Sequence, residues 1–428
     1  MSNTEINRIF IFEFISGGGF NHVDIPISLF TEGFGMLRVI VEDFKNLGFQ
    51  IKTLIDCRIQ HMIRYLKTDF TKEINQNMDI FLEVKKAVKD CKYVFIIAPE
   101  FSGILYNLTK IMKDQNKIIL SMNLEAIRLG SSKFETYKYF KAQEVSTPLT
   151  YHLPSHLLHK DHIIKIVSKF KLPVIIKPED GVGAESIFYF ENKSQISSFF
   201  TSNRSHFESD RDYIIQEYVP GKDLSVSIIG NSHGSNILSI NAQFVEISKL
   251  NSNSSYLGGY TPISDYENIR KIFKKQFRQL NLIGFTGYYG IDFIRKTDNS
   301  LSFIEINPRL TTSYIGIRNI TKKNPLLLIL HPDMDVNNVV DPNHEYLSHF
   351  FHLRLRYVGE LPFTEVNEGL IPQIIKEIPH IVSPPLALNE DPLFACFIAT
   401  KAKNLKDSKK QKNRLISALE KKEFRVVK

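Results

Sequence analysis

The sequence predicts a protein of mixed α/β and α+β class, with a parallel-sheet domain at the N-terminus followed by α+β subdomains. Strand-like and helix-like segments alternate up to about residue 122, and this rhythm is typical of βαβ units. Beyond it, strands are joined by glycine-bearing loops, and residues 287–309 show a hairpin pattern with acidic residues on one face. At 428 residues the chain has room for about two to four structural units.

The N-terminal elements begin with a buried strand and a tight loop. The apolar run Ile9–Ile15 predicts the strand, and Ser16–Gly19 predicts the loop. The loop lacks the GxGxxG spacing of a dinucleotide site, so we interpret it as a turn at the end of the strand. A helix is expected over Gly33–Leu47, ending at Gly48. Further strands are expected over Gln50–Ile55, Tyr93–Ala98 and Ile118–Ser121.

The next part carries one lysine before a helix and another before a glycine loop. Ser131 or Ser132 is the predicted cap of the helix Phe134–Ala142, next to Lys133. The strand Val174–Lys177 runs into K-P-E-D-G-V-G-A-E-S and returns as a strand. A Walker A loop opens a helix instead, so this is a different kind of glycine loop. Strands over Tyr213–Val219 and Leu224–Ile229 follow, separated by Pro220–Asp223.

The hairpin places two carboxylates opposite each other. If its turn, Thr297–Ser300, is symmetric, residues whose numbers sum to 597 are paired, as Asp292 and Glu305 are. Their Cβ atoms would lie roughly 5 Å apart. Asn307 lies two residues beyond Glu305 and therefore shares its face. We expect the alternate apolar residues to be buried on the other face, namely Ile291, Phe293, Ile304 and Ile306.

Opposed carboxylates indicate a bound cation. Like charges placed opposite each other destabilise a sheet unless something lies between them. Mg²⁺ prefers oxygen ligands and is commonly held by one or two carboxylates together with substrate phosphates. Asp292, Glu305 and the side-chain oxygen of Asn307 would supply such ligands. The alternative interpretation is the solvated polar face of an ordinary hairpin.

Single features of this kind are weak, but their order along the chain resembles the ATP-grasp superfamily from about residue 123 to about residue 325. The series runs from Lys133, through Lys177 with its glycine loop and the segment Gln216–Asp223, to Asp292 and the motif E-I-N-P-R at Glu305–Arg309. A narrower resemblance, to the tyramine–glutamate ligase group, lies in three short segments. They are Phe12–Phe20, Tyr256–Ile263 and Asp391–Thr400.

The resemblance implies a domain organisation. A pre-ATP-grasp α/β domain would span residues 1–122, and an ATP-grasp fold would follow it. The first ATP-grasp subdomain would span residues 123–212, and the second, with the metal site, residues 213–330. Residues 331–428 would form a small C-terminal extension with a basic tail.

The resemblance also implies roles for individual residues. Lys133 and Lys177 would neutralise ATP phosphates, and the loop with Gly181 and Gly183 would cover them. Asp292, Glu305 and Asn307 would hold Mg²⁺, or Mn²⁺ in its place. Arg309 would stabilise the transferring phosphoryl group or a substrate carboxylate, so Lys177 and Arg309 are the expected catalytic residues. The adenosine would be bound by Gln216, Glu217, Val219 and Asp223.

The implied reaction is ATP-dependent amide formation between a carboxylate and an amine through an acyl phosphate. In the narrower group the substrates are the glutamate side chain and tyramine, and Glu13, Gly258 and Gly259 would contact substrate. The alternative for Glu13 is a strand-end acid that caps a helix. Ser132 departs from the superfamily, which often has an acid before this lysine. Other amino-acid or peptide substrates remain an alternative, as does a non-catalytic nucleotide-binding or polyanion-binding protein.

The composition and the distribution of charge indicate where the protein works and which partners it can have. The net charge of +8 is carried by Lys401–Lys428 alone, so the rest of the chain is neutral and nucleic acid is not an expected partner. The spacing of its apolar residues predicts that part of this tail is an amphipathic helix lying on the protein; these residues are Leu405, Leu415, Ile416 and Leu419.

The three cysteines are far apart in the sequence and form no disulfide framework. No apolar run reaches membrane length and no secretory signal is visible, so we expect a cytoplasmic protein without a membrane partner. The sequence does not define the oligomeric state, and a homo-oligomer is one of the possible states.

Overall fold

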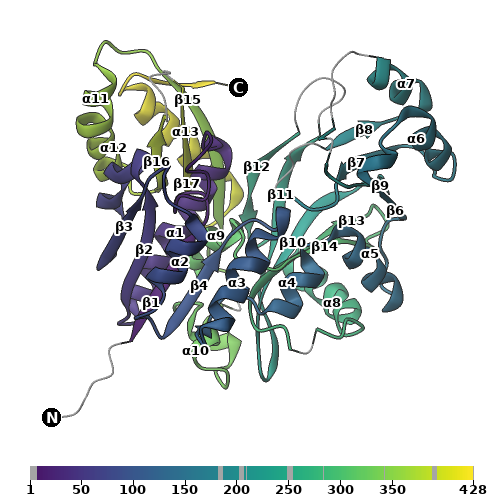
Figure 1. The fold of residues 1–428 in the computed structure, drawn as a ribbon, viewed down its shortest axis with the longest axis horizontal. Helices are drawn as coiled ribbons and strands as arrows, with labels where there is room; N and C mark the ends of the chain where they lie inside the picture. The colour runs from purple at the N-terminus through teal and green to yellow at the C-terminus, as the bar shows by residue number, and fades with distance from the viewer. Residues whose placement is uncertain are drawn as a thin grey trace.

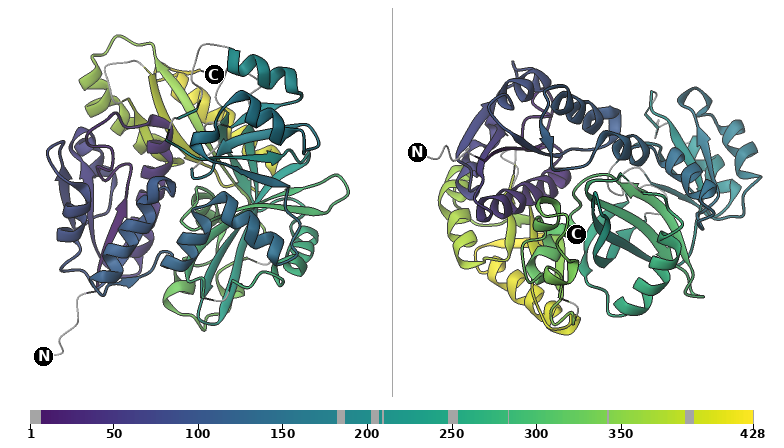
Figure 2. Two further views of the ribbon diagram at one scale, coloured as in Figure 1. Left: turned by 45° about the vertical axis from the view of Figure 1, so that its right-hand side comes forward. Right: turned by 90° about the horizontal axis from the view of Figure 1, so that it is seen from below.

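The computed structural model describes residues 7–181, 187–201, 207–208, 210–247, 254–282, 284–341, 343–387 and 393–427. Gly183 therefore lies outside the described residues. Three sheets form the framework, and Figures 1 and 2 show the parts that contain them arranged around a common centre. In the described part of the chain, no helix has both the length and the apolar character needed to cross a membrane.

The N-terminal part is an α/β domain with a parallel five-stranded sheet in the order β3-β2-β1-β4-β5. This confirms the predicted parallel sheet. Helix α1 begins six residues earlier than the pattern predicted, because apolar residues from Phe30 onward are already buried against the core. The elements are β1 (Arg8–Glu13), α1 (Ile27–Asn46), β2 (Gln50–Asp56), β3 (Phe70–Ile74), α2 (Ile80–Ala87), β4 (Tyr93–Ile97), α3 (Ile104–Asp114) and β5 (Ile118–Ile119), with 3-10 segments at Cys57–Tyr65 and Phe101–Gly103.

A second part has an antiparallel four-stranded sheet with its own hydrophobic core. Two helices, α6 (Lys160–Val167) and α7 (Lys193–Thr201), pack on this sheet. The sheet order is β6 (Thr150–Leu153), β9 (Tyr213–Glu217), β7 (Val174–Pro178) and β8 (Phe188–Phe190). Before it come α4 (Leu124–Gly130) and α5 (Lys133–Ala142), and the predicted cap is Ser132, whose hydroxyl accepts from the Glu135 amide at 3.0 Å.

The third sheet is antiparallel, has nine strands and includes the C-terminal residues. Strand β12 pairs with β15, so the C-terminal strands continue the sheet that carries the acidic hairpin. The strands are β10 (Lys222–Asn231), β11 (Gly234–Glu246), β12 (Ser255–Thr261), β13 (Gly287–Arg295), β14 (Leu301–Asn307), β15 (Ser348–Tyr357), β16 (Ile381–Leu386), β17 (Leu393–Ala399) and β18 (Phe424–Val427). The accompanying helices are α8 (Tyr266–Phe277), α9 (Ser313–Ile320), α10 (Leu327–Leu330), α11 (Phe363–Glu365), α12 (Ile371–Glu377) and α13 (Leu405–Glu420).

The predicted tail helix is confirmed as α13. Leu415 and Leu419 are buried in a C-terminal core, and Ile416 packs against it. Leu405 is half-buried at the start of the helix. Beyond the helix, β18 pairs with β15, so the basic tail is integrated into the fold.

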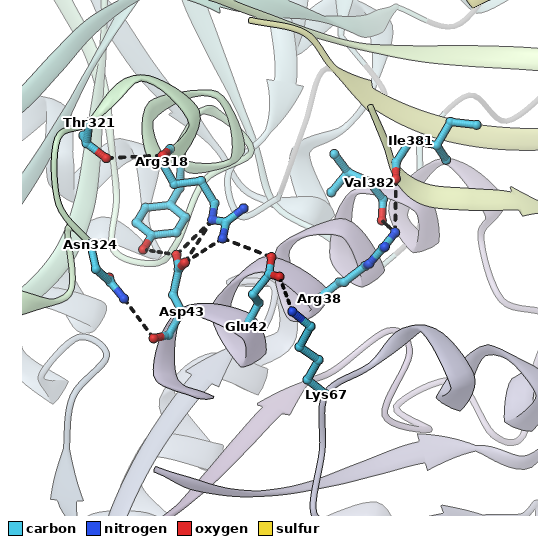
Figure 3. A network of polar contacts seen from close by, with 10 residues as sticks. Arg38, Glu42, Asp43, Lys67, Arg318, Thr321, Asn324, Ile381 and Val382 are labelled. Carbon is cyan, nitrogen blue, oxygen red and sulfur yellow. Dashed lines mark hydrogen bonds and ion pairs between the residues drawn. The ribbon is translucent and has the colours of Figure 1, made fainter. Parts of the chain in front are cut away.

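Helix α1 connects the N-terminal domain to the rest of the molecule. Its Asp43 accepts hydrogen bonds from Tyr314 at 2.8 Å and from Arg318 at 2.7 Å, both on α9. On its other side, Arg38 donates to two carbonyl groups of β16, at 3.0 and 3.1 Å (Figure 3). The helix is therefore held in place by both the acidic-hairpin region and the C-terminal strands.

Candidate active site

A cavity lies where the four-stranded sheet, the nine-stranded sheet and α1 meet. Its wall includes Ile175 of β7, Tyr218 beyond β9, Val245 beside β12, and Glu32 of α1. Three separate parts of the chain thus contribute to one site. Nine residues predicted from the sequence line this cavity: Lys177, Gln216, Glu217, Val219, Asp223, Asp292, Glu305, Asn307 and Arg309.

The hairpin register confirms the predicted opposition of Asp292 and Glu305. The register is not uniform, however. A bulge places Phe293 opposite Phe303, so that Ile304 is the extra residue of β14. The prediction that Ile304 is buried on the apolar face is wrong, because the bulge turns it to the cavity, where it is half-buried. Ile291, Phe293 and Ile306 are buried as expected.

The two carboxylates differ in their surroundings. Asp292 accepts from Gln243 and from Asn307, each at 3.1 Å. Glu305 Oε2 is enclosed and has no hydrogen-bond partner in the described part of the protein. Burial and the nearby Glu305 charge raise the pKa of Asp292 to about 7. Burial alone would raise the pKa of Glu305, but Lys133 and Lys177 outweigh it and lower that pKa.

This donor set fits a divalent cation. Apart from the Lys133 ammonium group at 3.7 Å, this enclosed carboxylate oxygen has no hydrogen-bond partner, and it lies beside a second carboxylate, so a bound cation would complete the arrangement. Two carboxylates and an amide are oxygen donors of the kind that Mg²⁺ accepts while keeping positions for phosphate oxygens. The residues present, Asp292, Glu305 and Asn307, are therefore suited to such an ion.

Both predicted lysines lie beside the carboxylates. The Nζ atom of Lys133 is 3.7 Å from Glu305 Oε2 and donates to the Gly181 carbonyl at 2.9 Å. Lys177 is only 6% exposed. Burial lowers its pKa, and the charge of Glu305 partly offsets this effect. The structure thus brings two cations and two carboxylates together, with Gly181 at the edge of the group.

The cavity also has apolar and polar lining residues apart from the charged group. Ile175, Ile187 and Ile304 supply apolar surface. Gln216 is buried, and its Nε2 donates to Thr150 at 2.9 Å. Burial raises the pKa of Asp223. Apolar side chains together with a buried amide and a carboxylate in one cavity are suited to a nucleoside.

Arg309 is held by a residue that the sequence analysis did not single out. Its Nε lies 2.9 Å from one oxygen of Glu100 and 3.0 Å from the other. Burial would lower the pKa of Arg309, but Glu100 outweighs it and the pKa is raised. Glu100 follows β4, at the carboxyl end of a parallel strand. Such strand ends frequently carry functional residues, and that signal was available in the sequence.

The residues predicted to contact substrate lie elsewhere. Glu13 is 2% exposed and does not line the cavity. It accepts from the amides of Ile15 at 2.9 Å and Ser16 at 2.7 Å, so it caps the loop after β1, which is neither of the two expected roles.

The expectation that Gly258 and Gly259 leave room for substrate is contradicted by their packing. A Cβ atom on Gly258 would lie 2.1 Å from the Phe350 carbonyl oxygen, and one on Gly259 would lie 2.1 Å from that of Ala242. Gly258 also has a φ of +114° beside a bulge. Both glycines therefore permit close approach of neighbouring strands.

Comparison with known proteins identifies the architecture. Residues 130–313 match the ATP-grasp domain family, and residues 67–127 match the pre ATP-grasp 3 domain family. The chain contains a pre-ATP-grasp domain followed by an ATP-grasp domain. The expected pre-ATP-grasp domain, ATP-grasp fold and use of ATP are confirmed by these matches.

The similar sequences and structures include ligases. The chain is 28% identical over 327 residues to tyramine–L-glutamate ligase of Methanocaldococcus jannaschii, an alignment that covers 75% of this chain and 87% of that protein. Its structure resembles an L-amino acid ligase from Bacillus licheniformis, with a TM-score of 0.61, 12% identity and 98% of each chain covered.

A carboxylase has the same fold. The biotin carboxylase domain of the Hydrogenobacter thermophilus 2-oxoglutarate carboxylase, solved with MgADP, gives a TM-score of 0.69 at 12% identity, covering 98% of this chain and 90% of that one. The ATP-grasp domain, together with the sequence similarity to a ligase over most of both chains, identifies the chain as an ATP-dependent carboxylate–amine ligase.

Proposed function

We propose that the protein joins the γ-carboxylate of glutamate to the amine of tyramine, with ATP converted to ADP and phosphate. One observation carries the ATP-dependent part of the proposal. Asp292 and Glu305 oppose each other in a cavity that also contains the buried Lys177. The choice of substrates is supported by the similarity to a tyramine–L-glutamate ligase over most of both chains.

The nucleotide would lie in this cavity with its phosphates at the carboxylates. Gln216, Glu217 and Val219 line the cavity and would meet the adenine edge. Asp223 would accept hydrogen bonds from the ribose hydroxyl groups. Lys133 and Lys177 would neutralise phosphate oxygens at the far end.

Asp292, Glu305 and Asn307 are the residues that would hold Mg²⁺, with Mn²⁺ as a substitute. The ion, when bound, neutralises charge on the β- and γ-phosphates. Beside it, Arg309 would bind the substrate carboxylate or the transferring phosphoryl group. Glu100 fixes the position of that guanidinium through the contacts at 2.9 and 3.0 Å.

The reaction would take place in two steps. The carboxylate of glutamate attacks the γ-phosphorus of ATP, which gives an acyl phosphate and ADP. The amine then attacks the acyl carbon, and phosphate leaves. No covalent bond to the protein is needed, because these side chains act by positioning the substrates and neutralising their charge.

The test measures ADP formation and analyses the product by mass spectrometry. The purified chain is incubated with ATP, Mg²⁺ and glutamate, with and without tyramine. The proposal expects an amine-dependent product whose mass equals glutamate plus tyramine minus water. Products with other carboxylates or amines, but none with this pair, would overturn the substrate assignment while keeping the ligase class.

A further inference from the structure

The cavity is also lined by a carboxylate that is not among the residues expected to bind ATP or Mg²⁺. Glu32 lies near the start of α1 and lines the cavity, although it belongs to the N-terminal domain. Its side chain is 23% exposed, and Oε2 has no hydrogen-bond partner in the described residues. A carboxylate oxygen open to a ligand cavity is a good acceptor for an amine.

A second chain segment holds Glu32 in place. His352 of β15 lies with Nε2 2.7 Å from Glu32 Oε1 and with Nδ1 3.1 Å from Thr31 Oγ1. Thr31 donates its single hydroxyl proton to the Ser28 carbonyl at 3.0 Å, so it accepts from Nδ1–H of His352. Nε2 and Oε1 then share one proton. Oε1 is therefore engaged, and Oε2 is the oxygen left to accept a hydrogen bond from a ligand.

The surroundings place this oxygen near the reacting end. Glu32 lines the same cavity as Arg309 and Tyr256. It also acts on Tyr256, whose pKa is raised chiefly by burial and then by Glu32. The Tyr256 hydroxyl accepts from Thr312 at 3.2 Å and keeps its own proton for donation. Glu32 thus lies close to the group expected to hold the acyl donor.

Other acids in this region are committed elsewhere. Glu100 is ion-paired with Arg309, Glu13 accepts from the amides of its own loop, and neither residue lines the cavity. Asp292 and Glu305 belong to the phosphate end, and Glu217 and Asp223 to the nucleoside end. Among the described carboxylates that line the cavity, Glu32 is the one left for a cationic or neutral amine.

We propose that Glu32 binds the amine substrate, accepting hydrogen bonds from its nitrogen at Oε2, and that His352 is the positioning residue that fixes Glu32. This proposal rests on the proposed ligase function. It implies that the amine is recognised by the N-terminal domain, whereas ATP is bound by the ATP-grasp subdomains. Formation of the acyl phosphate should then be independent of Glu32.

The test separates the two half-reactions. Hydroxylamine is a small neutral nucleophile that intercepts an acyl phosphate and gives a hydroxamate without needing a carboxylate to bind it. For Glu32→Gln we expect KM for tyramine to rise by about 10-fold to 100-fold, the loss typical of one hydrogen bond to a charged group. KM for ATP and the rate of hydroxamate formation should stay within about twofold of wild type. Glu365→Gln, at an exposed position on α11, is the matched control.

Two further variants keep the test decisive. Glu32→Asp retains a carboxylate and should give an intermediate KM for tyramine. His352→Gln keeps a donor toward Glu32 and should be milder than His352→Leu, again with hydroxamate formation unchanged. Thermal unfolding of each variant shows whether it is folded. If Glu32→Gln is not folded, the KM for tyramine of Glu32→Asp tests the role of Glu32 instead.

An unchanged KM for tyramine in folded Glu32→Gln would overturn the inference. So would a parallel loss of hydroxamate formation, because Glu32 would then act on ATP or glutamate. Failure of the proposed function is distinguishable from both outcomes. In that case the wild-type protein itself forms neither hydroxamate nor amide with glutamate and ATP.

Discussion

Asp292 and Glu305 are opposed in the sheet although the turn that joins their strands would pair Asp292 with Ile304. Near the turn, Arg295 pairs with Leu301 and Phe293 with Phe303, a register in which paired numbers sum to 596. The bulge at Ile304 shifts the register by one residue. It brings Glu305 to the cavity beside Asp292 and adds Ile304 to the apolar wall.

Replacement of Lys177 should remove activity without unfolding the protein. Lys177 is buried, and burial lowers its pKa although Glu305 is near. In Lys177→Met the apolar part of the side chain is kept and the charge for the phosphates is lost. We expect turnover to fall by at least about 10³-fold, with a circular dichroism spectrum like that of wild type. Glu305→Ala should likewise be folded and inactive. Near-normal turnover in either variant would refute its assignment.

The sequence predicted the local parts of this site well. Asp292, Glu305 and Asn307 belong to one hairpin, where strand alternation places Glu305 and Asn307 on one face and the bulge at Ile304 sets Glu305 opposite Asp292. The lysine before α5 and the lysine at the end of β7 were recognised by their order along the chain. These positions depend on short-range geometry, which a sequence pattern records directly.

Tertiary partners were not predictable in the same way. Glu100 and Arg309 are 209 residues apart in sequence, and Glu32 and His352 are 320 residues apart. No periodicity links such pairs, because the contact depends on how α1 and the loop after β4 pack on the other sheets. Gly258 was misinterpreted for a related reason, since the space around it is filled by β15, a strand distant in sequence.

Glu13 should give the folded protein a characteristic pH dependence. Burial raises its pKa from 4.5 to about 7, against the hydrogen bonds from Ser16 and Ile15. Between these two pH values the folded state binds more protons here than the unfolded state. The contribution to the free energy of unfolding is therefore full below pH 4.5 and is lost as the pH rises to 7, at up to about 1.4 kcal/mol per unit.

Urea unfolding of Glu13→Gln, compared with wild type between pH 4.5 and 8, measures this effect. The glutamine cannot titrate, so the variant should gain stability relative to wild type as the pH rises toward 7, with a constant difference above that value. If the free energies of unfolding of wild type and Glu13→Gln changed in parallel between pH 4.5 and 8, the raised pKa of Glu13 would be contradicted.

The contact between α1 and α9 should be a major source of stability. Asp43 is buried and accepts from both Tyr314 and Arg318 (Figure 3). Arg318→Ala would leave this carboxylate buried without its counter-ion, and we expect a loss of about 3–5 kcal/mol in the free energy of unfolding. Lys67→Ala is the control, because Lys67 pairs with Glu42 at 2.6 Å but is 61% exposed, and it should cost less than about 1 kcal/mol. If both variants lost the same free energy of unfolding in urea, the buried network would stabilise the fold no more than the exposed pair of Lys67 and Glu42 does.

The basic tail should contribute to stability and not to catalysis. Leu419 of α13 is fully buried in the C-terminal core, so Leu419→Ala should lower the free energy of unfolding by about 2–5 kcal/mol. Lys409 and Lys410 lie on the exposed side of the same helix. Their joint replacement by glutamine should leave stability within about 0.5 kcal/mol and turnover within about twofold of wild type. If the glutamine variant instead lost turnover, the positive charge of the tail would have to act in the reaction, because the apolar side of α13 that packs on the core is unchanged in that protein.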